Sequence, residues 1–364
     1  QELKNEVIVD DKQIAIIACY YPLNRISWSS KLKHKPINRE LLTRQIENNR
    51  QEKMISKSIP AIKEITNKTS SLVRQQYEEN PYPRWVNTTV FSNPSAVYDC
   101  LANIGLSLTD DVKEIKAPRI LIAGCGTGKH ALITASRFQN STVTALDLSL
   151  SSLSYAKRKT SELGVKNVDY LQGDILDLCE ESDKYDIVES SGVLHHMEHP
   201  EDGLKKLIAL LKPGGIMRLG LYSEYARQGV VSARKFIAQQ DIGGTIEDKI
   251  RAFRKSITDE DKTEGEKILF ISKWSDFYSM SECRDLFFHV KEHRFTLPQI
   301  KTMLEEMSLS FIGFEFSGNP AMDDFTTKFT DKDAALSLDL WDQYEKENPS
   351  TFLGMYQFWV RKFL

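Results

Sequence analysis

The sequence predicts an α/β protein whose sheet is mostly parallel and covered by helices. From Pro118 onward, short apolar β-type runs alternate with segments of helical periodicity, as in strand–helix–strand units. The first run, residues 119–123, ends in glycines at alternate positions, Gly124, Gly126 and Gly128, and a helix-compatible segment follows directly. Because glycine has no Cβ, such a turn lets the backbone approach a ligand closely.

The composition is that of an ordinary globular protein. Of 364 residues 41% are hydrophobic and 27% charged, and the formal net charge of −3 argues against a protein generally coated by nucleic acid. No apolar run approaches the roughly 20 residues of a membrane span, and the order of a signal peptide is not found at the N-terminus. Five scattered cysteines without a CxxC pair favour reduced thiols. We therefore expect a cytoplasmic protein without a membrane segment.

Residues 1–75 predict a helical N-terminal module. From Asn38 to about Arg74 apolar residues recur at helical spacing, and Pro60 is placed to start a second helix. Residues 76–117 are expected to form a linker or lid. Two prolines and several aromatics within residues 75–85 predict a rigid, extended segment, either a hinge packed on the next domain or a lid over a ligand pocket.

Residues 118–364 are expected to form the α/β domain. The predicted strands are 119–123, 142–147, 168–172, 185–190, 216–222, 309–316 and 352–362. The predicted helices between the first five strands are about 128–139, 150–163 and 199–211, and residues 212–215 form a tight turn. Helical insertions are predicted at about 223–295, after the fifth strand, and at about 317–350, after the sixth.

The glycine spacing discriminates between kinds of ligand site. A dinucleotide fingerprint needs G-x-G-x-x-G, and Lys129 occupies its third glycine position. A P-loop needs G-x-x-x-x-G-K-[ST], but Ala123 and His130 stand at its first glycine and its hydroxyl position. The next apolar run, residues 142–146, ends in Asp147, where a carboxylate can accept both hydroxyls of a ribose. Turn and acid together predict a nucleoside-cofactor site.

A G-x-G-x-G turn followed by an acid after the second strand resembles class I S-adenosylmethionine-dependent methyltransferases. Three further features match this family in order: residues 173–175 after the third strand, 190–196 after the fourth and 211–215 before the fifth. The two terminal β-type runs match the antiparallel end of its sheet. The resemblance implies a Rossmann-like, seven-stranded methyltransferase sheet.

Residues 76–85, 221–227 and 283–290 narrow the resemblance to a bacterial subgroup in which the domain follows a tetratricopeptide-type helical region. No internal repeat is visible in this chain. The resemblance leaves open a protein partner that docks on the N-terminal module.

The resemblance implies S-adenosylmethionine as the cofactor, S-adenosylhomocysteine as the product, and roles for particular residues. The three glycines would admit the methionine and ribose part, Asp147 would hold the ribose, and Asp174 the adenine amino group. An N-cap of a following helix is the alternative for Asp174. The other expected cofactor-binding residues are Cys125, Leu148, Ile175, Ser190, Tyr82 and Trp85.

His195 and His196 are the predicted catalytic residues, because an imidazole that titrates near pH ~6.5 can position or deprotonate a nucleophile. Adjacent residues after a strand point in different directions, so at most one is expected to face the pocket. A hydrogen-bonded structural histidine explains each equally well. With His199 they form H-H-x-x-H, but a zinc helix needs H-E-x-x-H and Pro200 breaks the turn, so no metal is expected.

These features predict a methyltransferase that acts on an O or N nucleophile of a small molecule or peptide. Motifs that mark DNA amino-group and cytosine C5 methyltransferases are missing, so duplex nucleic acid is not expected as acceptor. One alternative is a cofactor-binding adaptor with little catalysis that docks a partner through its N-terminus. A weaker one, a nicotinamide-dependent dehydrogenase, is disfavoured by Lys129 and by the antiparallel end strands.

Overall fold

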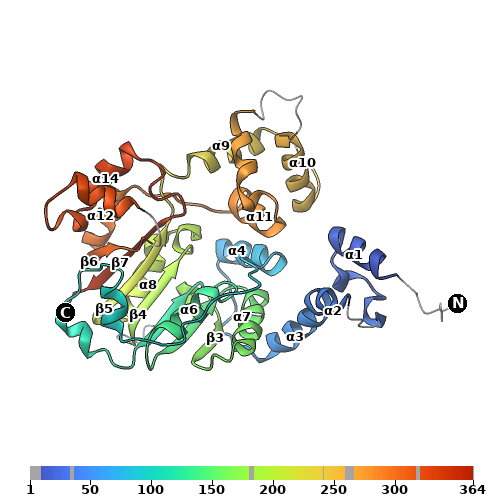
Figure 1. Cartoon of the computed structure of the whole chain (residues 1–364), viewed down its shortest axis with the longest axis horizontal. Helices are drawn as coiled ribbons and strands as arrows, with labels where there is room; N and C mark the ends of the chain where they lie inside the picture. The colour runs from blue at the N-terminus through green and yellow to red at the C-terminus, as the bar shows by residue number, and fades with distance from the viewer. Residues whose placement is uncertain are drawn as a thin grey trace. The chain divides into compact units, whose positions relative to one another are not determined.

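The structure is a computed structural model of the chain, and it describes residues 10–32, 37–179, 184–240, 242–258, 266–316 and 320–363. The chain divides into two compact units, Gln1–Ile59 and Pro60–Leu364 (Figure 1). In the described part, no helix has the length and apolar character needed to cross a membrane.

The first unit is helical, as its amphipathic pattern predicts. Its elements are α1 (Asp11–Tyr20), η1 (Leu23–Arg25), η2 (Ser29–Lys31), α2 (Arg39–Leu42), η3 (Thr43–Glu47), α3 (Asn48–Ile55) and η4 (Ser56–Ser58). A small core of Ile14, Leu23, Leu42 and Ile46 joins α1 to the helical run that begins with α2.

The prediction that Pro60 starts a helix is wrong. The Pro60 carbonyl accepts from the Gln172 N–H at 2.9 Å and the Ile62 N–H donates to the Gln172 carbonyl at 2.9 Å, so the chain is extended along the end of a strand. The next helix, α4 (Lys68–Glu79), begins after Asn67, whose side chain accepts from the N–H of Ser70. The expected module boundary at residue 75 falls inside α4, and residues 75–79 are helical rather than extended.

The second unit contains the predicted seven-stranded sheet, in the order β3-β2-β1-β4-β5-β7-β6 (Figure 1). The strands are β1 (Arg119–Ala123), β2 (Thr142–Asp147), β3 (Val168–Gln172), β4 (Tyr185–Ser191), β5 (Leu211–Leu221), β6 (Leu309–Phe314) and β7 (Tyr356–Lys362). The first five are parallel, and β7 pairs antiparallel with β5 and β6. The strand order reverses between β1 and β4, which is where open α/β sheets bind ligands.

The predicted turn at residues 212–215 is a bulge inside β5. Tyr185 pairs with Leu211 and Ile187 with Ile216, so three residues of β4 lie opposite six of β5. Gly214, with φ of +71°, supplies the left-handed backbone within the bulge.

Helices connect the strands and form both insertions. Before and between the first five strands lie α5 (Val97–Ala102), η5 (Asp110–Glu114), α6 (Lys129–Arg137), α7 (Leu150–Glu162), η6 (Ile175–Asp177), η7 (Leu194–His196) and α8 (Pro200–Leu210). The first insertion holds α9 (Gln228–Gln239), α10 (Ile246–Thr258), η8 (Glu266–Lys273), η9 (Ser275–Phe277) and α11 (Met280–Phe288), and α12 (Leu297–Glu306) follows it. The second holds α13 (Ala321–Lys328), η10 (Ala334–Leu336) and α14 (Leu338–Glu347); residues 241, 259–265 and 317–319 of the two insertions lie outside the described residues.

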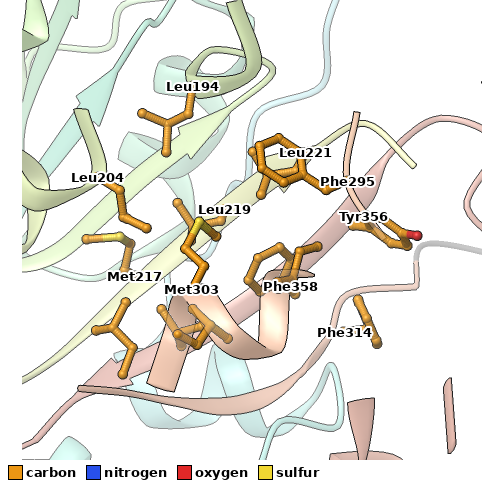
Figure 2. Close-up of a cluster of buried hydrophobic side chains, with 14 of the residues drawn as sticks. Leu194, Leu204, Met217, Leu219, Leu221, Phe295, Met303, Phe314, Tyr356 and Phe358 are labelled. Atoms are coloured by element: carbon orange, nitrogen blue, oxygen red, sulfur yellow. The ribbon is translucent and has the colours of Figure 1, made fainter. Parts of the chain in front are cut away.

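Strand alternation divides the sheet into an apolar face and a face that carries the site. Met217, Leu219 and Leu221 of β5 point into a cluster with side chains of α8, α12 and α14 (Figure 2). Residues at the intervening positions, Arg218 and Tyr222, line a cavity on the other face. The apolar face therefore anchors β5 and leaves its polar positions to the site.

Candidate active site

A cavity of about 870 Å³ lies at the carboxyl ends of β1, β2 and β4. Its lining comes from the glycine turn after β1 and from the residues that follow β2, β3 and β4. The chain around Tyr82 and helix α11 also contribute. The volume is in the upper part of the roughly 300–1,000 Å³ range of small-molecule sites.

The glycine turn is shaped by close neighbours. A Cβ on Gly124, which has φ of +79°, would lie 2.2 Å from a methyl carbon of Val193. A Cβ on Gly128, with φ of +80°, would lie 2.4 Å from the Cβ of Ala156 on α7. Gly124, Cys125 and Gly126 line the cavity, whereas Gly128 lies behind it and lets α6 and α7 pack closely.

Asp147 ties the glycine turn to the end of β2. Its Oδ2 accepts from the N–H of Gly126 at 2.7 Å, and its Oδ1 accepts from the N–H of Ser149 at 2.9 Å. Burial raises the pKa of Asp147 to about 6, against these backbone donors, which lower it. Because each carboxylate oxygen can accept twice, Asp147 keeps acceptor capacity toward the cavity, which it lines together with Leu148.

Asp174, which follows β3, both caps a short helix and lines the cavity. Its Oδ1 accepts from the N–H of Leu176 at 3.0 Å, so it caps η6, and it also lines the cavity with Gly173 and Ile175. A Cβ on Gly173 would lie 2.6 Å from Ile62, because the extended chain after Pro60 covers this turn.

Besides Gly128, two expected contact residues do not line the cavity. Ser190 points to the opposite face of β4, and its neighbour Ser191 lines the cavity instead. Trp85 lies behind the turn, where its Nε1 donates to the Thr127 carbonyl at 3.1 Å and its ring packs edge-on against Tyr155. Tyr82 lines the cavity as expected.

The two adjacent histidines have different surroundings. His196 lines the cavity, its Nδ1 donates to the Lys291 carbonyl at 2.7 Å, and its ring stacks on His289 at 3.5 Å between centroids. Burial lowers the pKa of His196 to about 4. His195 is buried outside the cavity lining and stacks on Tyr222. Within the described part of the chain, neither ring nitrogen of His195 has a hydrogen-bond partner.

One wall of the cavity carries a buried carboxylate that the sequence analysis missed. Asp285 of α11 is only 6% exposed, and its Oδ1 accepts from the hydroxyl of Tyr77 on α4 at 2.6 Å. Burial raises the pKa of Asp285 to about 6. Tyr222 and Tyr82 line the cavity with this pair. The stretch 283–290, singled out by its resemblance, was the available signal for Asp285.

Glu189 of β4, for which the sequence predicted no individual role, is the centre of a second charged group that lines the cavity. It contacts His130 of α6 and lies 3.8 Å from Arg218 of β5, whose Nε donates to Glu315 at 2.7 Å. Burial opposes ionisation of Glu189, but His130, Arg218 and Arg137 hold the pKa of Glu189 below its usual range.

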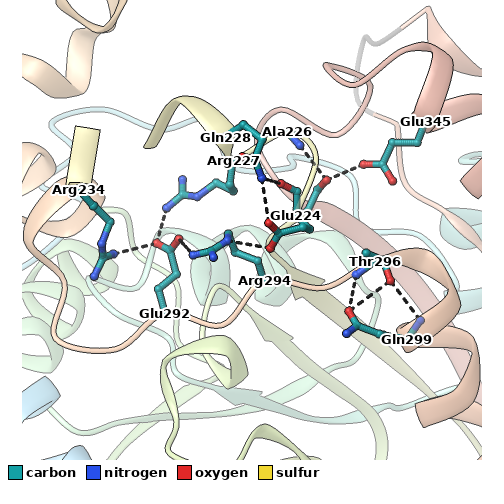
Figure 3. A network of polar contacts seen from close by, with 11 residues as sticks. Glu224, Ala226, Arg227, Gln228, Arg234, Glu292, Arg294, Thr296, Gln299 and Glu345 are labelled. Carbon is teal, nitrogen blue, oxygen red and sulfur yellow. Dashed lines mark hydrogen bonds and ion pairs between the residues drawn. The ribbon is translucent and has the colours of Figure 1, made fainter. Parts of the chain in front are cut away.

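An ion-pair network anchors the first insertion beside the cavity (Figure 3). Glu292, with a side chain 1% exposed, lies 2.7 Å from Arg227, 3.3 Å from Arg234 and 3.8 Å from Arg294. Arg294 also pairs with Glu224 at 2.9 Å. The network joins the end of β5 and α9 to the segment between α11 and α12.

No group of three or more His, Cys, Asp or Glu side chains in the described ranges is arranged to hold a metal ion.

Comparison with known proteins places these features in a family. Residues 120–215 match the family described as "Methyltransferase domain". An uncharacterized protein of Synechococcus sp. is 27% identical over 241 residues, which cover 65% of this chain and 58% of that protein. Malonyl-[acyl-carrier protein] O-methyltransferase of Priestia megaterium is 28% identical over 163 residues, or 42% of this chain and 57% of the enzyme.

The fold is shared with solved structures as well. PKMT2 from Rickettsia typhi, in complex with AdoHcy, superposes with a TM-score of 0.53 at 18% identity, covering 76% of this chain and 55% of that one. The chain thus spans less than 60% of the length of each of these three relatives. Residues 120–215 match a methyltransferase family, and the strand order and motif order support a class I S-adenosylmethionine-dependent methyltransferase domain. The tetratricopeptide-type character of the N-terminal unit stays a prediction.

Proposed function

We propose that this chain binds S-adenosylmethionine and transfers its methyl group to an N or O nucleophile of a small molecule or peptide. The observation that carries this is the shared cavity: the glycine turn, Asp147 and Asp174 line it together with the loop after β4. The family match supports the cofactor.

The bound cofactor supplies a methyl group that is already activated as a sulfonium, so the protein has mainly to bind and align. Asp147 would accept hydrogen bonds from the ribose hydroxyls, Asp174 would hold the adenine end, and the backbone of Gly124 and Gly126 would admit the methionine end. Such alignment of the nucleophile with the methyl group can lower the activation barrier by about 7–11 kcal/mol. The acceptor occupies the part of the cavity between Tyr82 and His196.

His196 is a positioning residue in this proposal. With a pKa of about 4 the ring is neutral at physiological pH, and its Nδ1–H donates a hydrogen bond to the Lys291 carbonyl. Its Nε2 is therefore an acceptor, available to orient an N–H or O–H group. The position of His195 outside the cavity lining favours a structural role for that ring.

Isothermal titration with S-adenosylhomocysteine tests the cofactor part. Asp147→Ala removes a hydrogen-bonding carboxylate, so the affinity should fall by about tenfold or more. Asp169→Ala is the matched control, because Asp169 is exposed on β3 and does not line the cavity. Unchanged affinity in Asp147→Ala, or binding of NAD without S-adenosylhomocysteine, would contradict the assignment.

Transfer itself is tested with methyl-labelled S-adenosylmethionine and fractions of cellular metabolites and peptides. Label in an acceptor that depends on the intact protein supports catalysis. Cofactor binding without transfer to any fraction would favour the adaptor alternative.

A further inference from the structure

The wall of the cavity between α4, β5 and α11 has a distinctive chemistry. It consists of three tyrosines and one carboxylate, Tyr77, Tyr82, Tyr222 and Asp285, which we name the tyrosine–aspartate wall. Burial raises the pKa of all three phenols, and the nearby charge of Asp285 raises it further. Within the described residues, no hydrogen bond is found for the hydroxyl of Tyr82 or Tyr222, whereas the Tyr77 hydroxyl donates to Asp285 and lies 3.3 Å from Nε2 of His289.

Asp285 provides the charge of this wall. His196, which also lines the cavity, is neutral at physiological pH, and burial holds the pKa of the adjacent His289 well below its usual range. Arg227 packs over the Tyr222 ring at 3.7 Å and is paired with Glu292. The Arg227 charge lowers the pKa of Asp285, whereas the acidic groups Glu292 and Asp276 raise it. The wall therefore presents a carboxylate and aromatic rings to the cavity.

We propose that the tyrosine–aspartate wall binds the methyl acceptor as an amine, with Asp285 paired to its ammonium group. This rests on the proposed methyl transfer and names its substrate class. A buried carboxylate is stable only with a partner, and an ammonium group supplies both charge and hydrogen-bond donors. Aromatic rings attract a cation further, and tyrosine hydroxyls accept its remaining N–H groups.

Asp285 also provides a place for the proton that the ammonium must lose. The N–H bond breaks and an O–H bond forms on Asp285, which leaves a lone pair on nitrogen. That lone pair forms the bond to the methyl carbon while the carbon–sulfur electron pair stays on sulfur, so the products are a methylammonium and a neutral thioether. Burial has already raised the pKa of Asp285 to about 6, which makes the carboxylate a better proton acceptor. Tyr77 is the positioning residue, because it fixes Asp285 through one oxygen.

Hexylamine and 1-hexanol are probes that differ only in the charged group. Each is titrated into the full chain with and without saturating S-adenosylhomocysteine. Hexylamine should bind about tenfold or more tightly than hexanol, and Asp285→Asn should abolish this difference. The asparagine still accepts from Tyr77, so the wall should stay folded. Tyr77→Phe should lower the affinity for hexylamine by a smaller factor than Asp285→Asn does. In both variants the affinity for S-adenosylhomocysteine should stay within about twofold of that of the original protein.

Glu282→Gln is the matched control, because Glu282 is on the same helix but does not line the cavity. It should keep the preference for hexylamine. Lowering the pH from about 7.5 to about 5 should also weaken the binding of hexylamine to the original protein, since Asp285 gains a proton while the amine stays cationic. Equal affinities for hexylamine and hexanol, or an unchanged preference in Asp285→Asn, overturn the proposal. If the original protein prefers hexylamine but does not bind S-adenosylhomocysteine, the proposed methyl transfer is contradicted and the amine site is not. The two proposals can therefore fail separately.

Discussion

Gly128→Ala should destabilise the second unit through the contact between α6 and α7. Gly128 has φ of +80°, a left-handed conformation that costs an L-residue about 1–2 kcal/mol. The added methyl would lie 2.4 Å from the Cβ of Ala156 and 3.1 Å from the Tyr170 hydroxyl. Ala156 has no flexible end that could move aside, so α7 must shift, and overpacking of this kind costs about 1–3 kcal/mol. The free energy of unfolding should fall by about 2–5 kcal/mol in total.

Gly164→Ala separates the two contributions. Gly164 follows α7 with φ of +71°, but nothing lies within 4 Å of the Cβ position. It should therefore lose only about 1–2 kcal/mol. Scanning calorimetry should show melting shifts of about 4–10 °C for Gly128→Ala and about 2–4 °C for Gly164→Ala, at about 2 °C per kcal/mol in a large domain. Equal shifts would refute the reasoning, because the backbone angle alone would then explain both losses.

Two further predictions concern buried carboxylates. Glu189→Ala removes the acidic partner of His130 and one of the two acidic partners of Arg218, so the free energy of unfolding measured in denaturant should fall by about 3–5 kcal/mol. Glu189→Gln keeps an acceptor for Thr134 but also removes the charge, so most of this loss should remain, and a Glu189→Gln protein as stable as the original would contradict the ion-pair argument. Burial raises the pKa of Glu345 to about 7 from 4.5, so the folded state binds the proton more tightly than the unfolded state. Its contribution is full below about pH 4.5 and should fall by about 3 kcal/mol as the pH rises through about 7. Glu345→Gln should flatten stability over this window, and an unchanged slope would argue against the shift.

The strands were predictable because buried parallel strands read as continuous apolar runs bounded by turn residues. The start of α12 also has a local signal in the sequence, since Thr296 and Gln299 form a capping box. The helix expected at Pro60 failed for a non-local reason. Backbone hydrogen bonds to Gln172 hold this segment extended, and nothing in the neighbouring sequence records that partner.

The expectation for Ser190 shows how a single position matters at a strand end. The loop after β4 was located correctly, but alternate residues face opposite sides of a sheet, so a shift of one residue exchanges Ser190 for Ser191. Trp85 failed differently: its segment lies at the glycine turn, yet the ring packs behind it.

The sequence by itself determined the fold class and the residues of the proposed cofactor half of the site, because Gly124, Gly126, Asp147 and Asp174 follow strand ends in a fixed order. The carboxyl ends of parallel neighbouring strands meet at one edge, so this order already implies proximity. Only the tertiary structure decided the other half. Tyr77 and Asp285 are 208 residues apart in the chain and meet through the packing of α4 against the first insertion. A contact of that kind has no periodicity or spacing in the sequence, and it becomes visible only when the insertion is placed over the sheet.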